Sequence, residues 1–121
     1  MTAVLKYLRA SRVTSSPDVD RIAAWFGLSD WAAVIEKRCT PIHGQAGSVE
    51  FDVSHRQLTI GINPADWLRA YIVCHEFAHV LLALLGFEVS DNEDFEEAAC
   101  NFLALRAVEA LALPEWLEVA A

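Results

Sequence analysis

The segment AYIVCHEFAHVLLALL, residues 70–85, places the strongest limit on what this chain can fold into. Its apolar residues recur at helical spacing and predict a helix in the hydrophobic core. His75, Glu76 and His79 interrupt this apolar pattern. Because burying a titratable side chain is costly unless it is paired, these three residues need a partner that the apolar helix itself does not supply.

The three polar residues form the pattern His-Glu-x-x-His. On a helix, residues four apart lie on one face with their β-carbons about 6 Å apart, so His75 and His79 can both reach one Zn²⁺ ion. Glu76 lies about 100° round the helix, where its carboxylate can act as general base toward a water molecule on the metal. The motif therefore predicts a hydrolytic zinc site, and a pair of buried structural histidines is the alternative.

A catalytic zinc ion usually has three protein ligands and one open position. The acidic start of the next expected helix, DNEDFEEAACNFLALRA, offers four candidates for the third ligand: Glu93, Asp94, Glu96 and Glu97. Glu97 lies one turn inside the helix and is the first choice, with Glu96 as the alternative. The neighbouring face of this helix is apolar, and we expect it to pack against the HExxH helix; it comprises Phe95, Ala98, Phe102 and Leu105.

The part of the chain before the HExxH helix divides into a helical and a β region. We expect three helices within residues 1–43, over residues 3–9, from Ser16 to Gly27, and over residues 30–37. Residues 44–63 contain two runs of alternating apolar and polar residues, SVEFDV and QLTIGIN. This alternation is typical of a β-hairpin.

Together these elements predict one α+β domain over residues 1–121. It is expected to be mainly helical, with a small antiparallel hairpin packed beside the HExxH helix. That helix is expected over residues 64–86 and the third-ligand helix over residues 92–112. The tail from Pro114 is expected to add one more helical turn.

The acidic composition argues against a nucleic-acid partner. The chain has 17 acidic and 9 basic residues and a net charge of −8, which repels phosphate backbones. The expected helices before residue 38 have the outline of a helix–turn–helix. However, the second helix offers only Glu36, Lys37 and Arg38 near its end, without the basic surround that a DNA-reading helix needs. We therefore expect ordinary helix packing there.

The cysteines and the absence of targeting segments indicate a soluble, cytoplasmic protein without a membrane partner. Cys39, Cys74 and Cys100 form no CxxC pair, so free thiols are expected rather than a disulfide framework or a thiolate zinc site. The first residues lack the pattern of a signal peptide. The longest apolar run is interrupted by the HExxH residues and is barely long enough to span a bilayer.

The order of these motifs resembles the ImmA/IrrE-type metallopeptidase domain found in prokaryotes, phages and mobile elements. The resemblance covers roughly residues 47–113 and is carried by TIGIN at the end of a strand, RAYIVCHEFAHVLL and EAACNFLA. It implies a minimal zincin-like fold with His75, His79 and Glu97 as zinc ligands and Glu76 as the catalytic carboxylate. Glu97 matches the family pattern and Glu96 does not, because Asn101 falls at the expected spacing only when the pattern starts at Glu97.

The resemblance implies limited proteolysis of a protein, often a helix–turn–helix repressor encoded nearby. Such a target would be basic, in agreement with the net charge of −8, and the hairpin edge could bind an extended peptide by strand addition. The alternative is a zinc-binding regulatory or interaction module, such as a toxin–antitoxin or antirepressor component, with little or no peptidase activity.

Two supporting roles have several candidates. A peptidase needs a group that stabilises the oxyanion besides the metal, and the candidates from sequence are His43, His55 and Tyr71. Metal-binding histidines usually donate their second ring N–H to another group, and Asn101 is a candidate partner.

Overall fold

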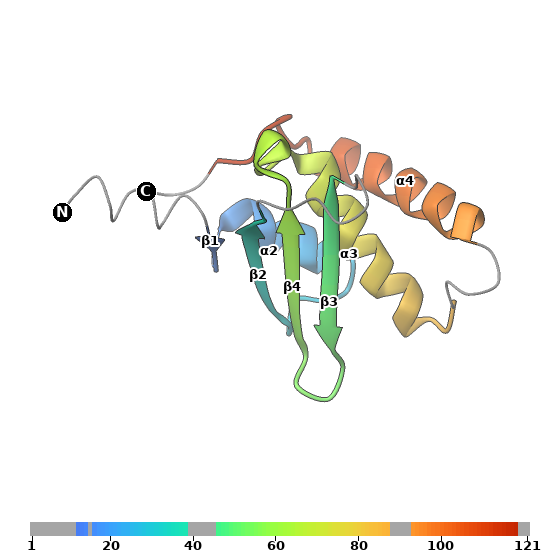
Figure 1. The fold of residues 1–121 in the computed structure, drawn as a ribbon. Coiled ribbons are helices and arrows are strands. Elements are labelled where there is room, and N and C mark those ends of the chain that lie inside the picture. Colours follow the sequence, from blue (N-terminus) through green and yellow to red (C-terminus); the bar gives the residue numbers. More distant parts are fainter. Residues whose placement is uncertain (1–11, 15, 39–45, 88–92, 119–121) are drawn as a thin grey trace.

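The computed structural model describes residues 12–14, 16–38, 46–87 and 93–118. Its elements, shown in Figure 1, are β1 (Arg12–Val13), α2 (Pro17–Trp25), β2 (Ala32–Lys37), β3 (Gly47–Asp52), β4 (Gln57–Ile62), the 3₁₀ turn η1 (Pro64–Asp66), α3 (Ala70–Leu84) and α4 (Glu93–Ala110). The helix expected over residues 3–9, together with Cys39 and His43, lies outside the described residues.

The strands form one four-stranded sheet in the order β1-β2-β4-β3. The β3–β4 hairpin is antiparallel, as expected, and β1 is antiparallel to β2. In contrast, β2 runs parallel to β4, so the sheet is mixed and larger than the small antiparallel hairpin expected from sequence. The predicted α+β class is confirmed.

The prediction of a helix over residues 30–37 is wrong, because Ala32–Lys37 forms strand β2. Along β2, Ile35 lies opposite Ile60 of β4, and both side chains are fully buried. A central strand position suits β-branched residues such as Val34 and Ile35, and pairing with β4 overrides the local helical pattern. The described part of residues 1–43 is therefore not purely helical, and no helix–turn–helix forms there.

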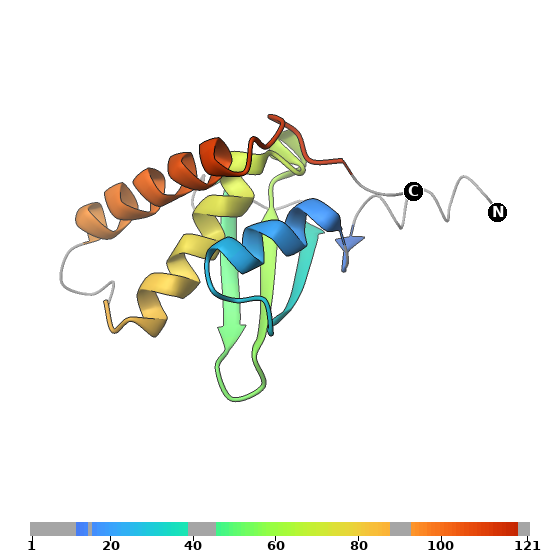
Figure 2. The same ribbon diagram turned by 180° about the vertical axis from the view of Figure 1, so that it is seen from behind.

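The helices cover one face of the sheet. Figures 1 and 2, seen from opposite sides, place α2 and α3 on the same face, with α4 packed beside α3. The rings of Phe26, which follows α2, and Phe77 of α3 stack with centroids 6.1 Å apart. Both side chains are buried in the core that these helices form with Leu58, Ile60 and Ile62 of β4.

The predicted helix over residues 64–86 is interrupted before α3 begins. The Asn63 side chain accepts a hydrogen bond from the Ala65 N–H (3.1 Å) and caps η1. Leu68 then adopts a left-handed conformation, with φ of 61°. The C-terminal segment pairs at this break, since the Leu117 N–H donates to the Leu68 carbonyl (2.7 Å) and the Ala70 N–H donates to the Glu115 carbonyl (2.9 Å).

This pairing also explains why the predicted extra helical turn after Pro114 is wrong. The segment is extended and forms an isolated antiparallel bridge between Arg69 and Trp116. The Arg69 guanidinium lies over the Trp116 ring, 4.8 Å from its centroid, and Leu117 is buried. The end of the described chain is thus hydrogen-bonded to, and packed against, the start of α3.

Helix α4 packs on α3 through a different face from the one expected. Phe95, Phe102 and Leu105 are exposed, with 62% of Phe102 accessible, and Ala98 is also exposed. The buried residues of α4 are Glu96, Cys100, Ala104 and Ala107. Because most of these side chains are small, the backbone of α4 can lie close to α3. The prediction that the Phe95–Leu105 face packs inward is therefore wrong.

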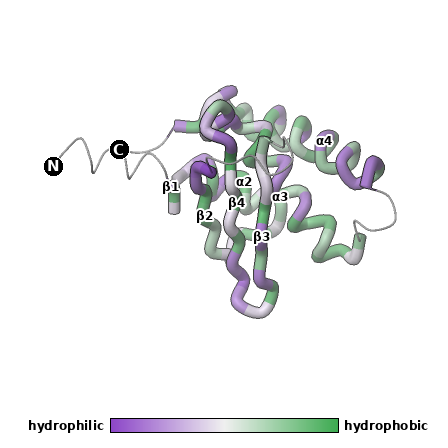
Figure 3. The backbone as a smooth tube through the Cα atoms, in the orientation of Figure 1, coloured by the Kyte–Doolittle hydropathy of each residue, from purple (hydrophilic) through white to green (hydrophobic). Residues whose placement is uncertain are grey.

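The hydropathy of the two helices differs where they lie together. Figure 3 shows hydrophobic last turns of α3 and a hydrophilic beginning of α4. The acidic start of α4 thus lies along an otherwise apolar helix.

Among the described residues, no helix is both long enough and apolar enough to cross a membrane.

A matched pair of substitutions tests the core and the orientation of α4. We expect Phe77→Ala to lower the free energy of unfolding by about 3–5 kcal/mol, because it removes a fully buried ring. Phe102→Ala should change it by less than about 0.5 kcal/mol, because that ring is exposed. Urea denaturation measures both values. A loss for Phe102→Ala as large as that for Phe77→Ala would contradict the observed orientation of α4.

Candidate metal centre

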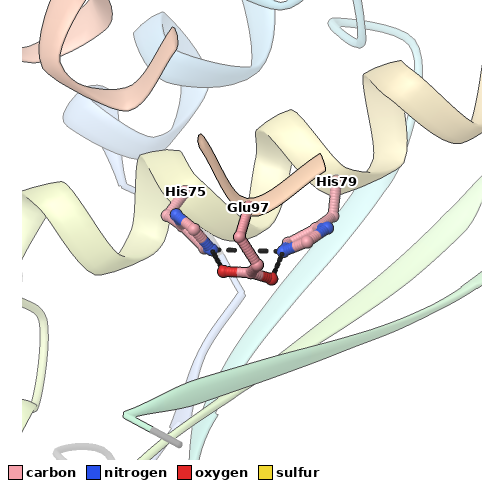
Figure 4. A group of neighbouring side chains, drawn as sticks. All are labelled: His75, His79 and Glu97. Atoms are coloured by element: carbon pink, nitrogen blue, oxygen red, sulfur yellow. Dashed lines mark hydrogen bonds and ion pairs between the residues drawn. The ribbon is translucent and has the colours of Figure 1, made fainter. Parts of the chain in front are cut away.

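Two neighbouring helices bring His75, His79 and Glu97 together. His75 and His79 lie one turn apart on α3, and Glu97 reaches them from the first turns of α4 (Figure 4). The two Nε2 atoms are 3.1 Å apart. One carboxylate oxygen of Glu97 lies 3.1 Å from His75 Nε2 and the other lies 3.0 Å from His79 Nε2. The structure thus places the three predicted ligands in one cluster.

The spacing of these atoms fits a bound cation. Ligand atoms around a four-coordinate ion, at metal–ligand distances of about 2.0–2.1 Å, are roughly 3.3 Å apart. The two Nε2 atoms are 3.1 Å apart, and each lies 3.0–3.1 Å from one of the two Glu97 oxygens, close to that spacing. Two imidazole nitrogens facing each other also leave at least one lone pair without a proton, and a cation satisfies both. These residues could therefore hold a metal ion.

The electrostatic environment of His75 favours the form that binds metals. Burial lowers its pKa, and the nearby charge of His79 lowers the pKa further, whereas Glu97 and Asn101 act in the opposite direction. The net lowering favours the neutral imidazole. A neutral imidazole is the ligand form of histidine.

Glu76 lies beside the cluster and is 5% exposed. Burial raises the pKa of its carboxyl group to about 7; His79 opposes this shift and the charge of Glu97 adds to it. The carboxylate belongs to the lining of a pocket that also includes His75, His79 and Glu97. Glu76 is therefore in the predicted position, next to the ligand cluster and outside the ligand set.

Gly47 of β3 makes room for Glu76. A β-carbon at this position would lie 3.2 Å from Glu76 Oε1 and 3.0 Å from Ile72 Cγ2. A side chain here would push Ile72 and Glu76 aside by a few tenths of an ångström, so glycine suits the close approach of strand and helix at this point. Sequence reasoning did not single out Gly47, although a glycine at the start of a strand is a signal of close backbone approach.

Glu96, the alternative third ligand, lies on the other side of His79. Its Oε1 atom is 3.0 Å from His79 Nδ1, whereas Glu97 is beside Nε2. Glu96, His79 and Cys100 form a second group whose ligand atoms lie close together. The described structure therefore separates the two adjacent acids, with Glu97 facing the pair of Nε2 atoms and Glu96 facing one Nδ1 atom.

Tyr71 and Asn101 form a polar pair at the edge of the cluster. The Tyr71 hydroxyl donates to Asn101 Oδ1 at 2.6 Å. Burial raises the pKa of Tyr71, and the negative charge of Glu97 raises it further, so the hydroxyl keeps its proton at neutral pH. Tyr71 is the one oxyanion candidate within the described residues that lines the pocket. His55, in contrast, lies in the hairpin connection with its Nδ1 atom 2.7 Å from Asp52.

The two described cysteines are buried and free, as expected. Burial raises the pKa of Cys74 to about 12, and burial together with the charges of Glu96, Glu97 and Glu76 raises the pKa of Cys100 to about 12. Both thiols therefore stay protonated at neutral pH. This state is typical of inert core cysteines.

The pocket over the cluster has a volume of about 580 Å³ and lies between strand β3 and the two helices. Strand β3 is at the edge of the sheet. Asn63 N–H donates to the Ala46 carbonyl at 2.9 Å, and antiparallel pairs alternate, so the backbone groups of Gly47, Val49 and Phe51 point away from β4. An unpaired strand edge thus borders the pocket among the described residues.

A second pair of substitutions tests the ligand set. We expect the protein to bind one Zn²⁺ per chain. Glu97→Ala should weaken zinc binding by more than about 100-fold, because losing a residue that only hydrogen-bonds to a metal ligand already weakens binding by about 10–100-fold. Glu93→Ala is the control, because Glu93 also lines the pocket but does not belong to the cluster. Chelator competition measures both affinities. Equal affinities for the two variants would contradict the assignment of Glu97.

Comparison of the chain with models of known protein families, with curated proteins and with solved structures finds no match. Any function proposed for the chain therefore depends on the geometry of the cluster and on the motifs in the sequence.

Proposed function

We propose that this chain is a zinc-dependent metallopeptidase of the ImmA/IrrE type that cleaves a protein at a limited number of sites. The observation that supports the proposal most strongly is the convergence of His75, His79 and Glu97 in an open pocket. Glu76 lies next to them without being part of the ligand group. Three protein ligands, a free coordination position and an adjacent carboxylate are the parts of a hydrolytic metal site.

Zinc is the metal that suits this ligand set best. Two imidazole nitrogens and one carboxylate oxygen are the ligands of catalytic zinc in several classes of peptidase, whereas Mg²⁺ and Ca²⁺ prefer oxygen ligands alone. When bound by His75, His79 and Glu97, zinc supplies Lewis acidity that polarises the peptide carbonyl and acidifies water.

In this proposal Glu76 moves the proton during hydrolysis. One of its carboxylate oxygens accepts a proton from the attacking water as the new carbon–oxygen bond forms. The same carboxyl group then donates that proton to the amide nitrogen as the carbon–nitrogen bond breaks. The Tyr71 hydroxyl lines the pocket and is the candidate donor to the developing oxyanion, a role in which its one proton turns from Asn101 Oδ1 to the oxyanion.

The substrate is proposed to bind along strand β3 as an added strand. The backbone groups of Gly47, Val49 and Phe51 face the open edge and can pair with an extended peptide next to the cluster. Glu93 also lines the pocket and adds negative charge there. Together with the net charge of −8, this favours a basic protein as substrate, such as a helix–turn–helix repressor encoded nearby.

Glu76→Gln separates catalysis from metal binding. The variant should keep its zinc, because Glu76 is not a ligand, and should cleave about 10²–10⁴-fold more slowly, because it cannot accept the proton. The assay follows the intact mass of the product of the gene adjacent to that of this chain. Zinc content is measured on the same samples. Cleavage by the zinc-loaded variant at the wild-type rate would contradict the role of Glu76.

One observation favours a second candidate function, a zinc-binding interaction module with little or no peptidase activity. Phe102 and Leu105 are exposed on α4 and offer an apolar surface to another protein. The same assay distinguishes the two functions. If wild-type protein and Glu76→Gln both bind zinc and form a stable complex with the neighbouring protein without cutting it, the interaction module is correct and the peptidase is not.

Two proline substitutions test the binding mode. Val49→Pro removes an N–H that faces the open edge, so we expect KM to rise by at least about tenfold with little change in Tm. Ser48→Pro removes an N–H that faces Gly61 of β4, so this control should lower Tm. Thermal denaturation and steady-state kinetics measure these effects. An unchanged KM for Val49→Pro would show that substrate does not add to this edge.

A further inference from the structure

We propose that Glu96 is a positioning residue that orients His79 and fixes which ring nitrogen of His79 carries the proton. The inference rests on the proposed metal centre and assigns a role to the acid next to the third ligand. It explains why the chain buries a carboxylate in the contact between α3 and α4, where no cationic side chain accompanies it among the described residues.

The geometry supports a hydrogen bond from His79 to Glu96. His79 Nδ1 lies 3.0 Å from Glu96 Oε1, and the side chain of Glu96 is 6% exposed. A carboxylate oxygen accepts only, so the Nδ1 atom carries the proton and donates it. In the neutral imidazole, the form that binds a metal, Nε2 is then the nitrogen without a proton, and this nitrogen faces Glu97 and His75.

Such a bond fixes both the plane of the ring and its tautomer. Metal-binding histidines commonly donate their second N–H to a carboxylate, which also makes the ligand nitrogen more basic. In this chain the two imidazoles differ, because the buried Nδ1 atom of His75 has no hydrogen-bond partner among the described residues. Glu96 therefore acts on His79 alone.

The position of Glu96 links the metal centre to helix packing. Glu96 and Glu97 are neighbours on α4, and they contact opposite sides of the same imidazole. A single helix thus supplies the third ligand and the partner that orients the second ligand. Any shift of α4 along α3 would disturb both contacts together.

The remaining oxygen of Glu96 raises a competing possibility. Its Oε2 atom is buried and has no hydrogen-bond partner among the described residues, and Cys100 lies in the same group as Glu96 and His79. A second cation held by these three residues would occupy the Nδ1 side of His79 and replace the hydrogen bond. The two arrangements predict different numbers of metal ions per chain.

The experiment compares Glu96→Leu with Glu96→Gln in the full chain. Glu96→Leu keeps the approximate size of the side chain and removes the acceptor, so it should weaken Zn²⁺ binding by about 10–100-fold. Glu96→Gln keeps an acceptor oxygen and should recover part of this loss. Glu93→Leu is the control, because Glu93 lies one turn earlier and does not contact His79. Chelator competition gives the affinities and elemental analysis gives the number of zinc ions.

A spectroscopic readout separates positioning from a merely structural role. Long-range ¹H–¹⁵N spectra of the zinc-loaded wild type should show His79 protonated at Nδ1, and Glu96→Leu should lose that signature while the His75 signals remain. Wild-type affinity in Glu96→Leu would overturn the inference. Two zinc ions in the wild type and one in Glu96→Leu would show that Glu96 is itself a ligand. Zinc binding as expected without any proteolysis would contradict the proposed function and leave this inference intact.

Discussion

The close packing of α4 on α3 is the constraint on which the candidate centre depends. Cys100, Ala104 and Ala107 face α3 with small side chains, and this lets the two helices lie close enough for Glu97 to reach both imidazoles. A larger residue at Ala104 would hold the helices apart. The large apolar residues of α4 point outward instead, so α4 buries less apolar surface than it could. Its buried side brings Glu96 and Glu97 to the histidines of α3.

Burial gives the cluster its chemical character. Desolvation keeps His75 in its neutral form and makes Glu76 a weaker acid than an exposed glutamate. The cluster opens into a pocket lined by β3, α3 and α4, and Glu96 and Cys100 are buried beside it. A cation bound by the cluster would balance the negative charge of the carboxylates and could still meet a further ligand from the pocket.

The sequence predicted the clustering of His75, His79 and Glu97 more accurately than the elements around them. HExxH and a downstream glutamate are local patterns, because helical geometry alone puts His75 and His79 on one face. Strand β2 was missed because its pairing with β4 joins segments distant in sequence, and residues 32–37 alone do not reveal that contact. The inward face of α4 was predicted wrongly because apolar periodicity favoured Phe102 and Leu105, while close packing selected the small residues. The break at Leu68 depends on the C-terminal segment, which no local pattern indicates.

The most direct test of the central claim is a crystal structure with anomalous diffraction recorded on both sides of the zinc absorption edge. We expect one strong zinc peak per chain, within bonding distance of Nε2 of His75, Nε2 of His79 and the Glu97 carboxylate, at the floor of the pocket beside β3. A peak elsewhere, or histidine rings turned apart with Glu97 in solvent in the presence of zinc, would contradict it.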